Sequence, residues 1–273
     1  MSNGSPRVSV PSRSRSLWLS VLLSTLGAAC LPTDAELGRT RPQRETTTKV
    51  ASSVKTTATA KPPASPKPPP PPVAPDPPLG TEFSDDFERT TVGPQWRVMS
   101  GRWHIDAGKL CVSGARNKPA WLKRRLPTNA VVEFDATSAS PDGDIKAEFW
   151  GDGRSSATSV SYNNATSYLT IWGGWKNRYH VLARIDEHAK TRRELMVDAT
   201  SSDFNRKPVE PNRTYRFRVE RRDGKTVQWS VDGQPILTYP DAEPLVGTGH
   251  EHFGFNNWEV PVCFDNLSVK ALP

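Results

Sequence analysis

Short alternating segments separated by turn residues are the feature that most constrains the fold of this chain. Residues 213–222 alternate apolar and charged side chains, which is the pattern of a strand with one buried face. Asp223-Gly224 separates this segment from a similar one at 225–231, and Asp232-Gly233 separates that one from 234–239. Asp-Gly between alternating segments predicts tight hairpins, because type I′ turns need positive φ at both central residues. This region is therefore expected to form antiparallel strands.

Similar segments recur throughout residues 81–273, and none of them has the period of a helix. The charged stretch 186–194 is expected to form a loop or a strand extension. Twelve or more strands in about 190 residues predict an all-β, two-sheet antiparallel sandwich or jelly roll. The further expected strands lie near 82–87, 102–106, 109–113, 120–125, 130–137, 145–150, 158–162, 167–173, 179–185, 251–257 and 262–270.

Proline and charge divide the chain into three parts. Of the 26 prolines, two lie in residues 1–30, thirteen in 31–80 and eleven in 81–273. The net charge of +7 divides into +3 (three Lys/Arg, no acid), +3 (seven against four) and +1 (26 against 25) over the same ranges. The part that folds is nearly neutral. This excludes a strongly basic nucleic-acid-binding domain, so we expect no nucleic-acid partner.

Residues 1–30 are expected to be a signal peptide of the lipoprotein type. Three arginines precede the apolar run 17–26, which at about ten residues is too short to span a bilayer but suits a signal peptide. Gly27-Ala-Ala-Cys30 resembles a bacterial lipobox, in which Cys30 carries the lipid. We expect secretion and anchorage to the cell envelope, with Leu31 indicating the outer membrane. The alternative is an ordinary cleaved signal peptide in which Cys30 has no role.

Residues 31–80 are expected to be a disordered linker. They contain no aromatic residue, and the stretch 61–78 is dominated by proline. Such a segment cannot bury enough apolar area to offset the entropy of ordering it, and its proline-rich end favours extended polyproline II. We expect a spacer that holds the domain away from its anchor. Recognition of the proline-rich stretch by a partner domain is the alternative.

Several motifs of residues 81–273 resemble one family. Phe83-Ser-Asp-Asp-Phe87, Gly93-Pro-Gln-Trp96 and 101–110 resemble the opening of concanavalin A-like lectin/glucanase domains of the laminin G-like type. Residues 249–258 and Phe264-Asp-Asn-Leu-Ser-Val269 resemble their closing segments. The resemblance implies a concanavalin A-like jelly roll over 81–273. Because that sandwich serves lectins, glycan-binding modules, glycoside hydrolases, lyases and adhesion domains, the function has to follow from the site.

A sugar-binding groove is expected where aromatic and polar side chains share the solvent face of neighbouring strands. A pyranose ring stacks on an exposed aromatic ring, and its hydroxyls need polar partners nearby. We expect Leu169 and Ile171 to face the core, which leaves Trp172 in solvent. The alternative is that the tryptophans belong to the core and that 256–258 is a structural bend. The expected glycan-binding residues are Trp150, Tyr168, Trp172, Trp175, His180, Arg184, Asn256, Asn257 and Trp258.

Catalysis would need a pair of carboxylates. Laminarinase-like members of the family carry Glu-x-Asp-x-x-Glu, and the nearest match, Glu133-Phe-Asp135-Ala-Thr-Ser138, lacks the third acid and can equally be a solvated strand face. Glu148 shares a face with Lys146 and Trp150, so it is the candidate acid, together with His180 or a second acid. Its alternative role is a surface charge paired with Lys146.

We therefore expect a surface-anchored, lectin-like module that binds an extracellular or cell-surface polysaccharide without catalysis. It would contact the membrane only through its lipid. A glycoside hydrolase or polysaccharide lyase of the same fold is one alternative, and a structural or adhesion domain that binds protein is another. No cofactor is expected, except a structural calcium ion that the resemblance implies at Asp85, Asp86 and Asp265, where the alternative is that these acids cap turns.

Cys111 and Cys263 are the only cysteines besides Cys30. In jelly rolls of this kind the first and last strands lie side by side, so the resemblance implies that the two thiols approach each other. A chain sent to an oxidising compartment would then join them in a disulfide. The alternative is that each is an independent buried thiol.

Replacing Cys30 by alanine tests the lipid anchor. The wild-type chain, expressed in a bacterium that processes lipoproteins, should enter the detergent phase in Triton X-114 partitioning. Cys30→Ala should leave it in the aqueous phase, because the acyl chains supply the membrane affinity. A wild-type protein already in the aqueous phase contradicts the prediction.

Overall fold

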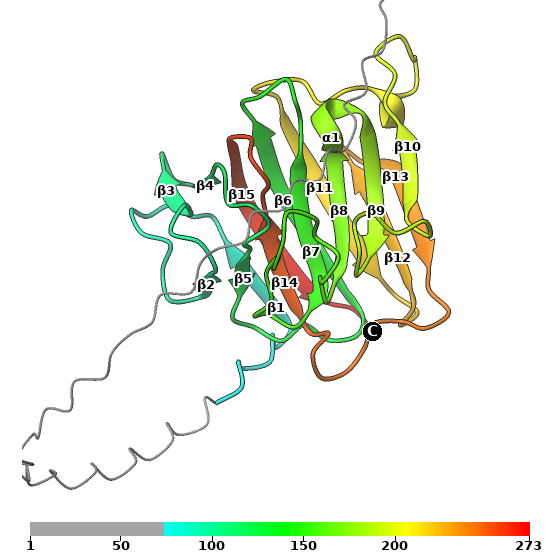
Figure 1. Cartoon of the computed structure of the whole chain (residues 1–273). Coiled ribbons are helices and arrows are strands. Elements are labelled where there is room, and N and C mark those ends of the chain that lie inside the picture. Colours follow the sequence, from blue (N-terminus) through cyan, green and yellow to red (C-terminus); the bar gives the residue numbers. More distant parts are fainter. Residues whose placement is uncertain (1–73) are drawn as a thin grey trace, which may run out of the picture. The chain divides into compact units, whose positions relative to one another are not determined.

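The computed structural model describes residues 74–273, which form fifteen strands in two antiparallel sheets (Figure 1). The predicted signal peptide, Cys30 and most of the predicted linker lie outside these residues. No helix in the described part is long and apolar enough to cross a membrane. The prediction of an all-β, two-sheet antiparallel jelly roll is confirmed.

The eight-stranded sheet has β15 near its centre, with β1 and β4 following one another along the same edge of that strand. Its strands, in spatial order, are β13 (Gln234–Pro240), β12 (Thr226–Val231), β11 (Thr214–Arg221), β6 (Ala130–Ser138), β15 (Val262–Ala271), β4 (Lys109–Val112) and β3 (His104–Asp106), with β1 (Glu82–Asp85) also paired to β15.

The seven-stranded sheet forms the other layer. Its strands, in spatial order, are β10 (Arg193–Met196), β9 (Tyr179–Arg184), β8 (Tyr168–Gly173), β7 (Ile145–Gly151), β14 (His252–Asn256), β5 (Ala120–Leu122) and β2 (Trp96–Val98). Two short turns, α1 (Gly174–Asn177) and η1 (Phe204–Arg206), complete the elements. The sequence did not predict β2, β10 begins at the end of the stretch 186–194 that was expected to be a loop or a strand extension, and the strand expected near 158–162 is a loop.

The hydrophobic core lies between the two sheets. β11 has the predicted alternation, since Tyr215, Phe217 and Val219 are buried and the side chains between them are partly exposed. Phe134 of β6 stacks on Phe217 with ring centroids 4.9 Å apart, and Phe255 of β14 meets Phe134 edge-on at 5.1 Å. Such aromatic pairs add about 0.5–1.5 kcal/mol each beyond the area they bury, so this contact joins the centres of both layers.

Both predicted Asp-Gly hairpins are present, but only one has the expected turn. Asp232 and Gly233, between β12 and β13, both have positive φ (50° and 74°), as a type I′ turn requires. Between β11 and β12 only Gly224 has positive φ. There the Asp223 carboxylate accepts hydrogen bonds from the backbone N–H groups of Lys225 and Thr226, so a longer turn is held by an aspartate side chain.

The outer face of the eight-stranded sheet carries a row of ion pairs. Arg216 and Arg218 of β11 pair with Asp135 and Glu133 of β6 at 3.2 and 2.9 Å, and Arg218 also reaches Glu220 at 2.7 Å. These partly exposed pairs contribute little stability individually. Glu133 and Asp135 therefore lie on the solvated face of a strand, as the alternative expected.

The end of the predicted linker packs against the domain. The Asp76 carboxylate pairs with Arg97 at 3.0 Å and lies 3.2 Å from His252 Nε2. Leu79 is buried, and its backbone N–H donates to the carbonyl of Arg125 at 2.8 Å. The last residues before position 81 are thus ordered against the fold.

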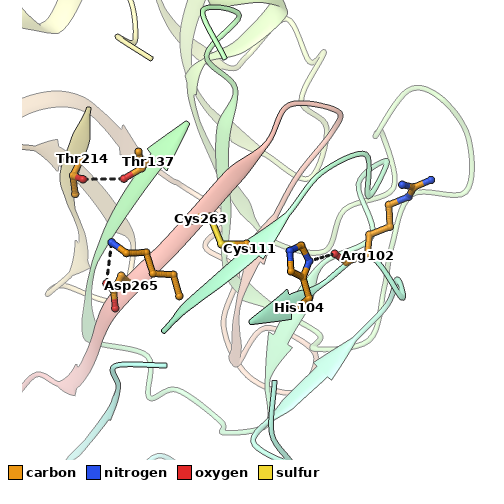
Figure 2. The surroundings of a disulfide bond; sticks show 8 residues. Arg102, His104, Cys111, Thr137, Thr214, Cys263 and Asp265 are labelled. Carbon is orange, nitrogen blue, oxygen red and sulfur yellow. Dashed lines mark hydrogen bonds and ion pairs between the residues drawn. A yellow bond between two sulfur atoms is a disulfide. The ribbon is translucent and has the colours of Figure 1, made fainter. Parts of the chain in front are cut away.

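Cys111 and Cys263 form a disulfide between neighbouring strands, as Figure 2 shows. The two residues lie directly opposite each other in the β4–β15 register, with Cα atoms 4.1 Å apart. They are 152 residues apart in sequence. The bridge therefore closes nearly the whole domain into one loop.

Replacing Cys111 by serine should lower the free energy of unfolding by about 4–5 kcal/mol, because the denatured chain regains the freedom of a very long loop. Urea denaturation of the variant measures this loss, and reduced wild-type protein is the matched control that should behave alike. Two thiols titrating with Ellman's reagent in denatured, unreduced wild type would show that the bridge is absent.

Candidate functional site

The outer face of the seven-stranded sheet is covered by its own chain. β8 and β9 direct Leu169, Ile171, Val181 and Ala183 to this outer face. The loop of residues 152–167 folds back over them and contributes the buried Tyr162 and Ala165 to the same cluster, which we call the outer cluster. Apolar side chains on both faces of a sheet require cover on both sides. The loop supplies that cover over part of the sheet.

Glu148, the candidate catalytic acid, is fully buried beneath this loop. Its carboxylate accepts hydrogen bonds from the hydroxyls of Tyr162 (2.9 Å) and Ser167 (2.6 Å) and from the side-chain amide of Asn256 (2.6 Å). Burial raises the pKa of Glu148 to about 7, against these three donors, which favour the charged form. With no exposed surface, Glu148 fastens the loop to β7 and β14, so it is not a surface charge, and it does not line the cavity described below.

A cavity opens beside the covering loop. It has a volume of about 340 Å³, which lies in the range of small-ligand pockets. Its wall combines aromatic rings with acidic and basic side chains. The lining residues are Asp142, Asp144, Lys146, Val160, Ser161, Ile171, Trp175, Lys176, Glu187, His188, Trp258, Glu259 and Val260.

Lys146 of β7 is a buried charge in this wall. Its ammonium donates to Glu187 at 2.6 Å and to the Asn117 side-chain oxygen at 2.8 Å. Burial acts to lower the pKa of Lys146, but the carboxylates of Glu187 and Asp144 outweigh it and hold that pKa above its usual value. Lys146 is therefore charged, and one of its three N–H donors has no partner among the described residues.

Trp175 is presented by a strained turn. Trp175, Lys176 and Asn177 all have left-handed φ angles (54°, 60° and 59°). This conformation costs roughly 1–2 kcal/mol per residue for L-amino acids. The Asn177 side chain holds the turn by accepting from the Val209 N–H and donating to the Pro141 carbonyl, both at 2.9 Å. Strain of this kind is concentrated at functional sites.

Trp258 enters the cavity from a bend after β14. The bend is held by Asn257, whose side-chain oxygen accepts from the Ala115 N–H (3.1 Å) and whose amide donates to the Val260 carbonyl (2.7 Å). Arg116 lies over the Trp258 ring, 4.5 Å from its centre. Asn256 and Asn257 are fully buried structural residues, so their predicted sugar contacts are wrong, whereas Trp258 does line the cavity.

Tyr168, Trp172 and His180 face the core rather than solvent, which corrects the prediction for β8 and β9. Trp172 is 1% exposed and stacks on His180 with ring centroids 3.5 Å apart. The Tyr168 hydroxyl donates to Asp241 at 2.6 Å. Both strands have apolar side chains on both faces, so alternation alone could not tell inside from outside.

His180 is neutral. Its Nδ1 accepts a hydrogen bond from the Gly173 N–H and its Nε2 donates to the Lys207 carbonyl, both at 3.0 Å. Burial lowers the pKa of His180 to about 4. Arg184 does not line the cavity, and it pairs with Asp241 at 2.8 Å. Neither residue belongs to the candidate site.

Trp150 is also a core residue, because β7 contains a bulge. Gly151 and Phe149 pair with successive residues of β14, which leaves Trp150 as the extra residue, with a φ of 54°. The bulge turns its ring inward, where the Arg221 guanidinium lies 4.0 Å from the ring centre. The prediction that Trp150 shares the outer face with Glu148 is therefore wrong.

The acids expected to bind calcium do not fit that ion. Both oxygens of Asp85 are bonded to the Arg89 guanidinium, at 2.5 and 2.8 Å, and Asp265 pairs with Lys109 at 3.3 Å. The carboxylates of Asp85 and Asp265 are therefore already paired with a cationic side chain. The Asp86 carboxylate accepts a hydrogen bond from the Glu88 N–H of its own turn. Among the described residues no group of three or more His, Cys, Asp or Glu is placed to hold a metal.

Asp144, Lys146 and Glu187 are the buried charged residues of the cavity wall that sequence reasoning did not assign to the site. Period-two alternation places Asp144 and Lys146 on one face of the strand, and that signal was available. Glu187 reaches Lys146 from 41 residues further along the chain, in a stretch without periodicity. Of the predicted sugar-binding residues, the structure brings only Trp175 and Trp258 to the cavity.

No protein-family model matches the chain, and no curated protein is significantly similar to it in sequence. Among solved structures it is similar to the carbohydrate-binding module CBM66 of Bacillus subtilis, with 14% identity, 67% of this chain and 97% of that chain covered, and a TM-score of 0.45. A Bacillus subtilis protein of unknown function with a galectin-like fold shows 15% identity, 71% and 97% coverage, and a TM-score of 0.49. The alginate lyase Aly36B shows 12% identity, 71% and 99% coverage, and a TM-score of 0.47. With identities and TM-scores this low, the function has to be argued from the cavity.

Glu148→Gln is expected to change how stability depends on pH. The pKa of Glu148 is about 7 in the folded state and 4.5 in the unfolded chain. The folded state therefore binds this proton more tightly, which stabilises the fold fully below pH 4.5, and this contribution is lost as the pH rises through 7. Relative to the glutamine variant, wild type should lose on the order of 3 kcal/mol of unfolding free energy between pH 5 and pH 8. Urea denaturation of both proteins at the two pH values measures the difference, with exposed Glu82→Gln as control. A difference that is equal at both pH values contradicts the assignment.

Proposed function

We propose that the protein is a lectin-like module that binds a polysaccharide in this cavity without transforming it. The observation that carries the proposal is the presence of two partly exposed tryptophans, Trp175 and Trp258, in one cavity with buried polar side chains. Aromatic rings offer the flat apolar surface on which a pyranose stacks, and the polar groups can bond its hydroxyls.

The two rings are held in place before any ligand binds. The Arg192 guanidinium lies 4.6 Å from the Trp175 ring centre, as Arg116 does at 4.5 Å from Trp258. Each arginine packs over its tryptophan ring, and both rings keep part of their surface exposed. A ring that is already fixed loses little entropy on binding, which favours affinity.

The absence of catalysis is part of the proposal. Glu148, the acid with the clearest catalytic pattern in the sequence, has no exposed surface. Glu187 does line the cavity, but its carboxylate is engaged by Lys146 at 2.6 Å. A lipid-anchored position in the cell envelope through Cys30 would place such a module where extracellular polysaccharides occur.

Replacing Trp175 or Trp258 by alanine should weaken glycan binding at least about tenfold, because each variant loses a stacking surface. The full chain would first be screened against a panel of immobilised polysaccharides, and its hits measured by calorimetry. Met196→Ala, which removes an exposed apolar side chain of β10 outside the cavity, is the matched control and should bind normally.

A panel without any hit, or binding that survives both tryptophan changes, overturns the proposal. Reducing-end release and absorbance of unsaturated products are measured on every hit. Turnover of a bound polysaccharide would favour the hydrolase or lyase alternative instead.

A further inference from the structure

We propose that the cavity selects glycans carrying a free amino group, with the Asp144 carboxylate as the acceptor for the sugar ammonium. The inference rests on the proposed glycan binding and adds the chemical class of the ligand. It follows from the balance of charges in the cavity wall, from the burial of Asp144 and from the two tryptophan rings.

Most charges in the wall already have a partner. Lys146 is paired with Glu187, and Glu259 at the rim is paired with Arg116. The remaining rim charges, Asp142 and Lys176, are exposed to solvent and of opposite sign. Asp144 is left as the buried acid of this wall that has no hydrogen bond or ion pair among the described residues and shares Lys146 with Glu187 only at longer range.

Asp144 is nine-tenths buried, with 9% of its surface exposed. Its side chain makes no hydrogen bond or ion pair with any described residue, although it lines the cavity. Burial raises its pKa, and Lys146 opposes the rise. A buried carboxylate without donors is unfavourable. A ligand that brings N–H donors and a positive charge removes this unfavourable state.

The backbone fixes the direction of this carboxylate. Asp144 has a left-handed φ of 62°, and Gly143 before it has 70°. The Asp144 N–H donates to the Gly173 carbonyl at 3.0 Å, and a side chain at position 143 would come within 2.7 Å of that same oxygen. Only glycine fits there, so the loop before β7 packs tightly on the turn that carries Trp175. Asparagine tolerates a left-handed φ as aspartate does, which makes Asp144→Asn a conservative test.

The tryptophans favour a cation as well. Ammonium groups are attracted to the faces of indole rings, and the attraction is strongest where water is excluded. An ammonium also forms three hydrogen bonds, whereas an N-acetylated amine is neutral and offers a single N–H. The acetylated form of the same sugar therefore cannot satisfy Asp144 in the same way.

The test compares two oligosaccharides of equal length and linkage, chitosan hexamer with free amines and chitin hexamer with acetylated amines. Calorimetry on the full chain should show about tenfold or more tighter binding of the aminated oligomer. Asp144→Asn should remove most of this preference, because it weakens binding of the aminated oligomer far more than binding of the acetylated one. Asp106→Asn, at an exposed position of β3 in the other sheet, is the matched control and should keep the wild-type preference for the aminated oligomer.

A second measurement needs no variant. Glucosamine should displace the aminated hexamer from the protein at a lower concentration than glucose or N-acetylglucosamine does. Equal or tighter binding of the acetylated hexamer, or a preference that survives Asp144→Asn in a folded variant, overturns the amine inference. If neither hexamer binds but another panel polysaccharide does, the amine inference fails and the proposed function stands. If nothing in the panel binds, both fail.

Discussion

The fold depends on the fact that the seven-stranded sheet is apolar on both faces where β8 and β9 lie. On its inner side Tyr168 and Trp172 pack into the core, and on its outer side Leu169 and Ile171 belong to the outer cluster. A sheet of this kind needs cover on each side, and here the second layer and the loop of residues 152–167 provide it. The loop covers only part of the outer face. The cavity lies where that cover ends, so the candidate site is a consequence of incomplete cover over an apolar sheet.

Buried polar groups determine how the cover is attached. Glu148 bonds Tyr162 and Ser167 of the covering loop, and Lys146 bonds Glu187 of the loop between β9 and β10. A buried charge without a partner would destabilise the fold, so each of these groups favours the one loop conformation that supplies its hydrogen bonds. Specificity of this kind fixes the shape of the cavity wall. Asp144 is the neighbour that this arrangement leaves without a partner.

The sequence predicted the layers well and the faces of two strands poorly. Tyr215, Phe217 and Val219 alternate with charged residues, so their burial was predictable and is confirmed. Leu169 and Trp172 stand in a segment that is apolar at nearly every position, where alternation carries no information about direction. The inward turn of Trp150 comes from a bulge, and a bulge is defined by the partner strand rather than by local sequence.

The position of β15 has a consequence for the order in which the domain can assemble. It is the last strand of the fold, yet it lies between β6 on one side and β4 and β1 on the other. Until residues 262–271 have been synthesised, the sheet has a gap near its middle and Cys111 has no partner. The earlier strands therefore cannot close into the native sheet while the ribosome is still making them. The strands on either side of β15 can join into the native sheet only once β15 is in place, and the Cys111–Cys263 bridge can form only then.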